Sequence, residues 1–176
     1  FDFSKNNFSR GIPSSICSQD SLRELHLSKT TSMLTGELPS NLQNCTNLIS
    51  LDLQKNKFTG KIPSWMGENL SSVEFLSLRS NNLDGDIPHQ LSQLTHLQIL
   101  DLSHNALTGV IRRSFGNFSA KRVSQNSLRE FSDIGADVFL NWNGKELDFF
   151  AHLDFLVLVD LSHNNLFGNI PGEFED

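Results

Sequence analysis

One short sequence phrase recurs along most of the chain and constrains its fold more than any other feature. Two apolar residues separated by one residue are followed, three positions later, by Asn. The phrase begins at residues 1, 25, 51, 76, 100 and 159, and only the second copy lacks the Asn, with Thr30 in its place. Most copies continue with an apolar residue, a Gly and then Ile-Pro or Leu-Pro. Such self-similarity indicates units that cannot bury their apolar sides alone and therefore stack into a solenoid.

Each part of the phrase has a physical reason. Alternation of apolar residues predicts a short strand whose leucines point inward and whose intervening side chains face solvent. The Asn is expected to bond the backbone of adjacent turns, because a buried amide without partners would cost about 1–3 kcal/mol. Gly permits positive φ or close backbone approach, and Pro suits an irregular outer segment. Apolar residues three past the Pro position should extend the core along the convex side: Ile16, Leu42, Met66, Leu91, Phe115 and Phe174.

The phrase resembles the leucine-rich repeat pattern Leu-x-x-Leu-x-Leu-x-x-Asn-x-Leu, and its spacing lies in the range of that family. The expected fold class is an α/β-type solenoid, a leucine-rich repeat horseshoe with short parallel strands on its concave face. Residues 1–118 would form five units, the first truncated, and residues 155–176 a final truncated unit. Residues 119–154 do not fit the repeat and are expected to be an insertion, called the island below. The two Asp-Leu-Ser-His-Asn copies that flank the island should then be neighbours in space.

The island contains a predicted hairpin. Residues 138–142 are expected to form one strand, Asn143-Gly144 a turn, and residues 145–150 a second strand. An insertion of this length in a regular array is more often functional or disordered than an idle loop, and its aromatic residues favour an ordered fold against the repeats. The island residues of interest are Phe139, Trp142, Asn143, Gly144 and Lys145.

Charge and composition narrow the classes of partner. The net charge is −6, which disfavours nucleic acid and anionic membrane surfaces as general partners. No stretch is long and apolar enough to span a bilayer, so membrane attachment would need a helix outside this sequence. The chain starts at Phe1 without Met, as expected of a piece of a longer protein. Cys17 and Cys45 do not make a disulfide framework; by default they are expected to be small buried hydrophobic residues, and whether they meet stays open.

The intervening side chains of the strands form the candidate ligand-binding surface. Adjacent strands lie about 4.8 Å apart, so equivalent side chains should form columns across the concave face. One interpretation is a polar groove that holds an extended peptide or a protein surface; the plainer one is a solvated face built from the repeat consensus. The candidate residues are Arg23, Glu24, His26, Lys29, Asp52, Lys55, Glu74, Phe75, Arg79, Asp101 and His104.

The sequence contains no convincing catalytic set. Asp101 and His104 flank Ser103, but residues three apart on an extended strand point to opposite faces, so a nucleophilic triad is not expected. The same phrase returns at residues 160–163, which marks it as scaffold. No metal-spaced Cys/His set and no phosphate-binding Gly loop occurs. We therefore expect no enzyme activity, no catalytic residue, no metal and no cofactor.

Four Asn-x-Ser/Thr sites predict N-glycosylation of an extracellular protein. They are Asn7, Asn44, Asn69 and Asn117. Three of the four follow the Pro position by five or six residues, on the expected convex side, where a glycan would not clash with neighbouring units. The repeat consensus offers an equally good explanation of this placement.

Two further segments carry a narrower resemblance. The phrase Leu-x-Gly-x-Ile-Pro is similar to that of plant extracellular leucine-rich repeats. Residues 141–148, Asn-Trp-Asn-Gly-Lys-Glu-Leu-Asp, and residues 156–166 resemble the island end and final repeats of plant receptor-like proteins of cell-surface immunity. Asn143 and Ile134 stand where that family usually has Lys and Tyr.

This resemblance implies an extracellular ligand-recognition segment of a receptor-like protein in immune or developmental signalling at the plasma membrane. It implies a peptide, protein or glycan ligand, and as partners a receptor-kinase adaptor and a co-receptor of the SERK type. Three alternatives remain open. They are the ectodomain of a leucine-rich repeat receptor kinase, a secreted polygalacturonase-inhibitor-like protein, and a truncated copy without a signalling role.

Overall fold

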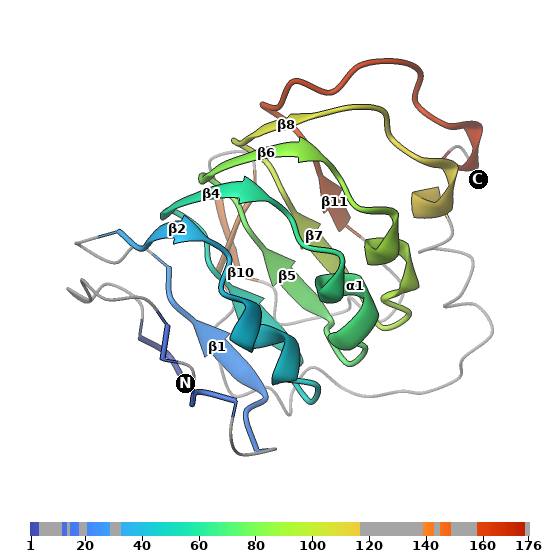
Figure 1. Ribbon diagram of the computed structural model, residues 1–176. Helices are drawn as coiled ribbons and strands as arrows, with labels where there is room; N and C mark the ends of the chain where they lie inside the picture. The colour runs from blue at the N-terminus through green and yellow to red at the C-terminus, as the bar shows by residue number, and fades with distance from the viewer. Residues whose placement is uncertain are drawn as a thin grey trace.

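The computed structural model describes residues 1–3, 12–13, 15–17, 21–28, 33–116, 139–142, 145–148 and 158–174. The described chain winds through successive coils, each of which adds one short strand to a curved parallel sheet (Figure 1). Its strands, in order across the sheet, are β1 (Glu24–His26), β3 (Ser50–Asp52), β5 (Phe75–Ser77), β7 (Ile99–Asp101) and β11 (Leu158–Asp160). An isolated parallel bridge between Asp2 and His26 adds the first coil. The predicted solenoid with parallel strands is confirmed, and this sheet is called the concave sheet below.

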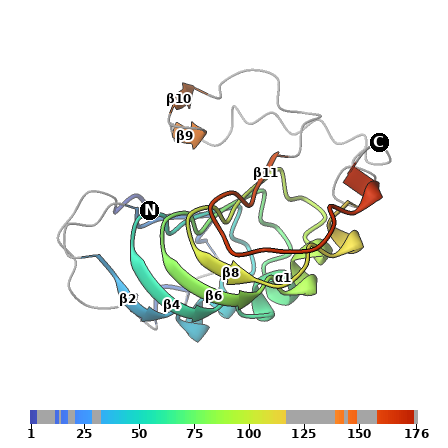
Figure 2. The same cartoon turned by 90° about the horizontal axis from the view of Figure 1, so that it is seen from above.

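A second parallel sheet runs along another side of the coils (Figure 2). It contains, in order, β2 (Thr35–Glu37), β4 (Lys57–Lys61), β6 (Asn82–Asp86) and β8 (Ala106–Thr108). The sequence does not predict these strands, because each contains at most one buried apolar residue, such as Phe58 or Leu83, which is too few to show an alternation. The strands form because equivalent segments of neighbouring coils stack and pair with each other. The sequence of a single segment does not indicate this pairing.

Short helices form the convex side of the coils. They are η1 (Ser40–Asn44), α1 (Trp65–Asn69), η2 (His89–Gln93), η3 (Arg113–Gly116) and η5 (Gly172–Phe174). The predicted convex core residues Leu42, Met66, Leu91 and Phe115 are buried in them. Ile16 packs partly buried against the same core, whereas Phe174 in the last described coil is exposed.

The Asn of each unit joins two coils, as the sequence predicts. Asn81 shows the pattern: its amide nitrogen donates to the carbonyl oxygens of Leu53 and Leu78, and its Oδ1 accepts the Phe58 N–H at 3.1 Å. Equivalent bonds are made by Asn56, Asn105 and Asn164. Asn6 and Thr30 lie outside the described residues.

The coil that contains β11 stacks directly on the coil that contains β7. Val159 pairs with Leu100 in the concave sheet, and Val110 bridges to Phe167 on the side of the second sheet. On the convex side, Gly116 lies so close to Glu173 that a Cβ there would overlap the Glu173 side chain. The two Asp-Leu-Ser-His-Asn copies are therefore spatial neighbours, as predicted.

The predicted hairpin is confirmed in its backbone. Strands β9 (Phe139–Trp142) and β10 (Lys145–Asp148) are antiparallel, and Trp142 is paired with Lys145. Figure 2 shows the hairpin on the side of the concave sheet that faces away from β2, β4, β6 and β8. The turn residues Asn143 and Gly144 and the predicted island boundaries lie outside the described residues.

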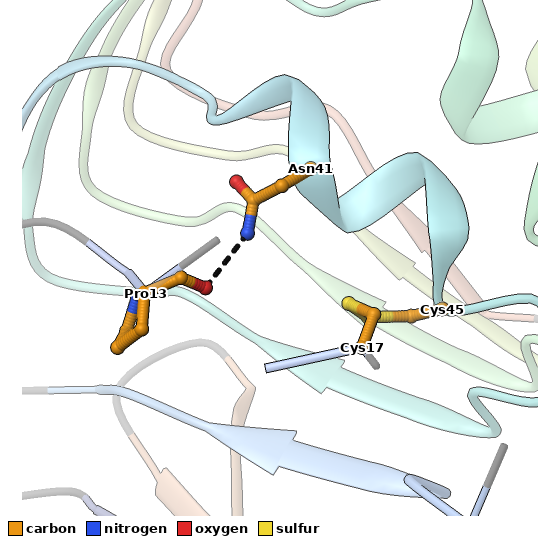
Figure 3. Close-up of a disulfide and its surroundings, with 4 residues drawn as sticks. All are labelled: Pro13, Cys17, Asn41 and Cys45. Carbon is orange, nitrogen blue, oxygen red and sulfur yellow. Dashed lines mark hydrogen bonds between the residues drawn. A yellow bond between two sulfur atoms is a disulfide. The ribbon is translucent and has the colours of Figure 1, made fainter. Parts of the chain in front are cut away.

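Cys17 and Cys45 form a disulfide (Figure 3), which answers the question of their pairing that the sequence left open. Their Cα atoms are 4.9 Å apart, and both side chains are buried. Beside the disulfide, the Asn41 side chain donates to the Pro13 carbonyl oxygen at 2.9 Å. The two cysteines occupy different positions after their prolines, and only the stacking of the first two coils brings them together.

Candidate binding surface on the concave sheet

The concave sheet presents one side chain of every strand to the core and the flanking side chains to the opposite face. The core residues are Leu25, Leu51, Leu76, Leu100 and Val159. Of the predicted ligand-binding residues, Arg23 and His104 are exposed. Glu24, His26, Lys55, Glu74 and Arg79 are half-buried, Asp52, Phe75 and Asp101 are buried, and Lys29 lies outside the described residues.

The three buried members contradict the expectation that this row faces solvent. Asp52 is 9% exposed, and Phe75 and Asp101 are each 4% exposed. Phe75 stands in register with Ile99, which in turn pairs with Leu158, so an apolar row crosses three adjacent strands. Neither Phe75 nor Ile99 belongs to the main core cluster, although both are buried.

The strand aspartates bond their own turns. Asp52 Oδ1 accepts the backbone N–H of Gln54 at 3.0 Å, and Asp101 Oδ1 accepts that of Ser103 at 3.0 Å. Asp160 accepts the N–H of Ser162 in the same way. Burial raises the pKa of Asp52 and of Asp101, and these hydrogen bonds act against that increase. The repeated carboxylate therefore stabilises the turn that follows its strand, which supports the interpretation of the phrase as scaffold.

A Ser, a His and an Asp do meet near β1, but they do not form a catalytic relay. The His26 Nε2 atom lies 2.9 Å from Ser50 Oγ, and His26 is paired with Asp52 in the register of the sheet. Asp52 Oδ2, however, accepts the Gln54 side-chain amide at 3.1 Å. Ser50 is also 1% exposed, which keeps a substrate away from its hydroxyl. The sequence does not indicate the contact between His26 and Ser50, because these residues lie on neighbouring coils.

An ionic cluster crosses the last three strands of the concave sheet. Arg79 Nη1 donates to Ser103 Oγ at 2.6 Å and to Asp160 Oδ2 at 3.4 Å, and lies 3.7 Å from Asp101 Oδ2. Ser103 Oγ in turn donates to Asp101 Oδ1 at 2.6 Å. The three charged side chains are mostly shielded from solvent. Asp160 was not among the predicted site residues, and its only sequence signal was the equivalence with Asp101.

Two imidazole rings lie next to this cluster. The rings of His104 and His163 are stacked with their centroids 4.1 Å apart and their planes 13° from parallel. Both residues have positive φ, 56° for His104 and 55° for His163, a backbone conformation that few residues other than Gly adopt. Burial lowers the pKa of His104, the nearby Arg79 and His163 lower it further, and Asp160 acts in the opposite direction. His104 therefore faces His163 and does not complete a triad with Ser103 and Asp101.

The remaining predicted sites are only partly described. Asn44 is exposed at the end of η1 and Asn69 is half-buried at the end of α1, both on the convex side, whereas Asn7 and Asn117 lie outside the described residues. Among the described residues, no group of three or more His, Cys, Asp or Glu is placed to hold a metal ion. No helix in that part of the chain is long and apolar enough to cross a membrane.

Comparison with known families identifies the repeat. One "Leucine rich repeat" family model matches residues 46–107 and 71–120, and a second model of the same description matches residues 155–176. The chain is also 38% identical over 145 residues to the tomato (Solanum lycopersicum) receptor-like protein EIX2, a match that covers 75% of this chain.

Solved structures of plant receptors share the fold. The plant peptide hormone receptor RGFR1, in complex with RGF2, matches 98% of this chain with a TM-score of 0.72 and 31% identity. The Arabidopsis receptor kinase HAESA, in complex with the peptide hormone IDA and the co-receptor SERK1, matches 98% with a TM-score of 0.70 and 27% identity. The chain spans 14% of the length of EIX2, 22% of the RGFR1 chain and 23% of the HAESA chain.

Proposed function

The chain belongs to the leucine-rich repeat family and is related to plant receptor-like proteins, and from this premise we propose that it is an extracellular ligand-recognition segment of such a receptor. It acts by binding a peptide or protein on its concave sheet and not by catalysis. Its place is the outer side of the plasma membrane, where the receptor to which it belongs carries an immune or developmental signal.

A row of concave side chains stands in register across five strands, and its two ends carry this proposal. The row runs through Glu24, Ser50, Phe75, Ile99 and Leu158. Glu24 at one end and Leu158 at the other are half-buried, whereas the three side chains between them are buried. An extended peptide laid across parallel strands meets a new coil about every 4.8 Å, so it would contact a polar side chain at one end of the row and an apolar side chain at the other.

The solved relatives support a peptide as the ligand. Both RGFR1 and HAESA are described in complex with a peptide hormone, and both match nearly the whole of this chain. In this proposal the residues Arg23, Glu24, His26 and Glu74 meet polar parts of the peptide, since their side chains are exposed or half-buried.

The island and the final coil form the second part of the proposed receptor surface. The hairpin lies on the concave side, and β11 closes that end of the concave sheet (Figure 2). We place the ligand between the concave sheet and the island residues Phe139, Trp142 and Lys145. The end of the island and the final coil would meet a receptor-kinase co-receptor of the SERK type, a partner that the HAESA complex contains. N-glycans on Asn44 and Asn69 would stay on the convex side, away from both surfaces.

A matched pair of charge reversals tests the proposed surface. Peptides are first selected from a random synthetic library on the intact, disulfide-bonded chain. Glu24→Arg changes the concave sheet, and Glu68→Arg makes the same change on the convex helix α1. We expect Glu24→Arg to weaken the selected peptides by about tenfold, or roughly 1.4 kcal/mol, and Glu68→Arg to leave their affinity unchanged. Equal effects of the two variants, or an effect of Glu68→Arg alone, would contradict the concave site.

A further inference from the structure

The junction between β7 and β11 holds together two coils that are distant in sequence. Backbone bonds cross it from Leu102 N to Asp160 O at 2.9 Å and from His104 N to Ser162 O at 3.0 Å. The side chains of His104 and His163 stack at the end of the same junction. Any change in the charge of these two rings therefore acts directly on the attachment of the final coil.

We propose that this junction is a pH-sensitive clamp, in which protonation of His104 and His163 loosens the final coil from the rest of the solenoid.

The geometry brings two titratable rings together. Their centroids are 4.1 Å apart, and both residues have positive φ just after strands β7 and β11. Two neutral imidazoles stack favourably at this separation. Two imidazolium rings at the same separation repel each other, and the repulsion acts across the junction.

Of the charged groups that face the pair, Arg79 favours the neutral form of His104 and Asp160 favours its charged form. Among the described residues these groups are Arg79, Asp101 and Asp160, with Lys55 two coils away in the same column. Arg79 already shares its guanidinium with both carboxylates, and Asp160 also accepts from Ser162. The carboxylates are thus engaged by existing donors, while the positive charge of Arg79 opposes the protonation of His104.

The direction of the effect follows from linkage. The pKa of His104 is lowered in the folded chain relative to the ordinary value of 6.5, so its contribution to stability is complete above that value and is lost as the pH falls through the folded pKa. Asp101 acts oppositely, because its raised pKa makes the chain lose stability as the pH rises through it. Asp101 and Asp52, whose pKa is also raised, do not belong to the stacked pair, so substitution of the two histidines separates their effect from that of the rings.

Amide hydrogen exchange of the full disulfide-bonded chain tests the clamp. Exchange is measured at about pH 7.5 and about pH 5.0, corrected for intrinsic rates, in a peptide covering β11 and in one covering β5 as an internal reference. We expect a severalfold loss of protection in the β11 peptide at the lower pH and little change in the β5 peptide. Equal changes in the two peptides, or no change in either, would overturn the proposal.

Substitutions assign the effect to the two rings. The His104→Asn/His163→Asn double variant removes both titrating groups and keeps a residue that tolerates positive φ, so its β11 protection should no longer depend on pH. The control His89→Asn changes an exposed histidine on the convex helix η2 and should keep the full pH effect. In the unsubstituted chain, NMR titration of the imidazole protons should also give His104 a pKa below the ordinary value of 6.5. An undiminished pH effect in the double variant, or a His104 pKa at or above 6.5, would contradict the clamp.

Discussion

At the scale of single residues, the side-chain amide of Asn is what links one coil to the next. Asn105 Nδ2 donates to the carbonyl oxygens of Leu78 and Leu102, and its Oδ1 accepts the Leu83 N–H at 3.1 Å. An Asp at this position would lack the donor, and a Ser would lack the second polar atom. The short amide thus satisfies backbone groups of two coils at once, which is why the position could be recognised from the sequence.

Replacement of Asn81 by Ala tests this role. The variant leaves the Leu53 and Leu78 carbonyl oxygens and the Phe58 N–H without their side-chain partner in a buried place. We expect a loss of about 2–4 kcal/mol in the free energy of unfolding, measured by urea denaturation, because each unsatisfied group costs about 1–3 kcal/mol before water relieves part of it.

Two further variants serve as controls for Asn81→Ala. Asn82→Ala, at an exposed neighbouring position, should shift the unfolding free energy by less than about 0.5 kcal/mol. Thr30→Ala, at the one unit without Asn, should also destabilise less than Asn81→Ala. Equal shifts in all three variants would mean that the amide bonds do not hold the coils together.

At the scale of elements, the convex helices stack so closely that some positions accept only Gly. A Cβ added to Gly67 in α1 would overlap the backbone carbonyl of Gln90 in η2. Gly67 does not have positive φ, so the restriction comes from the neighbouring coil and not from its own backbone. The sequence alone does not explain the Gly at this position, because the group that excludes a side chain is the Gln90 backbone on the next coil.

Gly67→Ala should therefore destabilise the protein although Ala favours helices. We expect a loss of roughly 1–3 kcal/mol or more in the free energy of unfolding, since a backbone group cannot move aside as a flexible side chain can. Gly172→Ala in η5 is the matched control, because an added Cβ there meets nothing within 4 Å. A stabilised Gly67→Ala variant would show that α1 and η2 can separate freely.

The island hairpin leads to a different prediction at the same scale. Trp142→Ala removes the largest aromatic side chain of β9. From the sequence, this side chain is expected to anchor the island against the repeats. We expect faster proteolytic cleavage between residues 119 and 154, with the melting temperature of the coils unchanged. The same cleavage rate in the variant and the unsubstituted chain would show that Trp142 does not hold the island.

At the scale of the whole molecule, stability is the sum of the contacts between neighbouring coils, with the disulfide at one end. The buried apolar core continues from coil to coil without a break from Leu22 to Phe115. The Cys17–Cys45 disulfide joins the convex segments of the first two coils across a sequence separation of 28. Cys45 belongs to the unit whose sequence has Thr30 in place of the Asn, so the covalent bond lies in the part of the array without that amide side chain.

Removal of the disulfide should destabilise the first coil before the others. For a loop of this length, the chain-entropy model gives about 3–4 kcal/mol. In the Cys17→Ser/Cys45→Ser variant we expect lower exchange protection at the start of the chain, with the coils from β5 to β7 keeping theirs. The melting curve of the unsubstituted chain should shift on addition of reductant, and that of the variant should not. A uniform loss of protection along the array would contradict a local role.

Local repetition determined most of the fold, because each unit repeats the same strand, turn and outer segment. The concave strands, the Asn links, the convex core through Leu42 and Met66, the hairpin and the adjacency of β7 and β11 could all be predicted in this way. Only the tertiary structure decided the second sheet, the Cys17–Cys45 disulfide, the burial of Phe75 and Asp101, and the contact of Arg79 with Asp160. These features depend on the register in which one coil stacks on the next and on the side chains that this register brings together. The sequence of a single repeat determines neither the register nor those contacts.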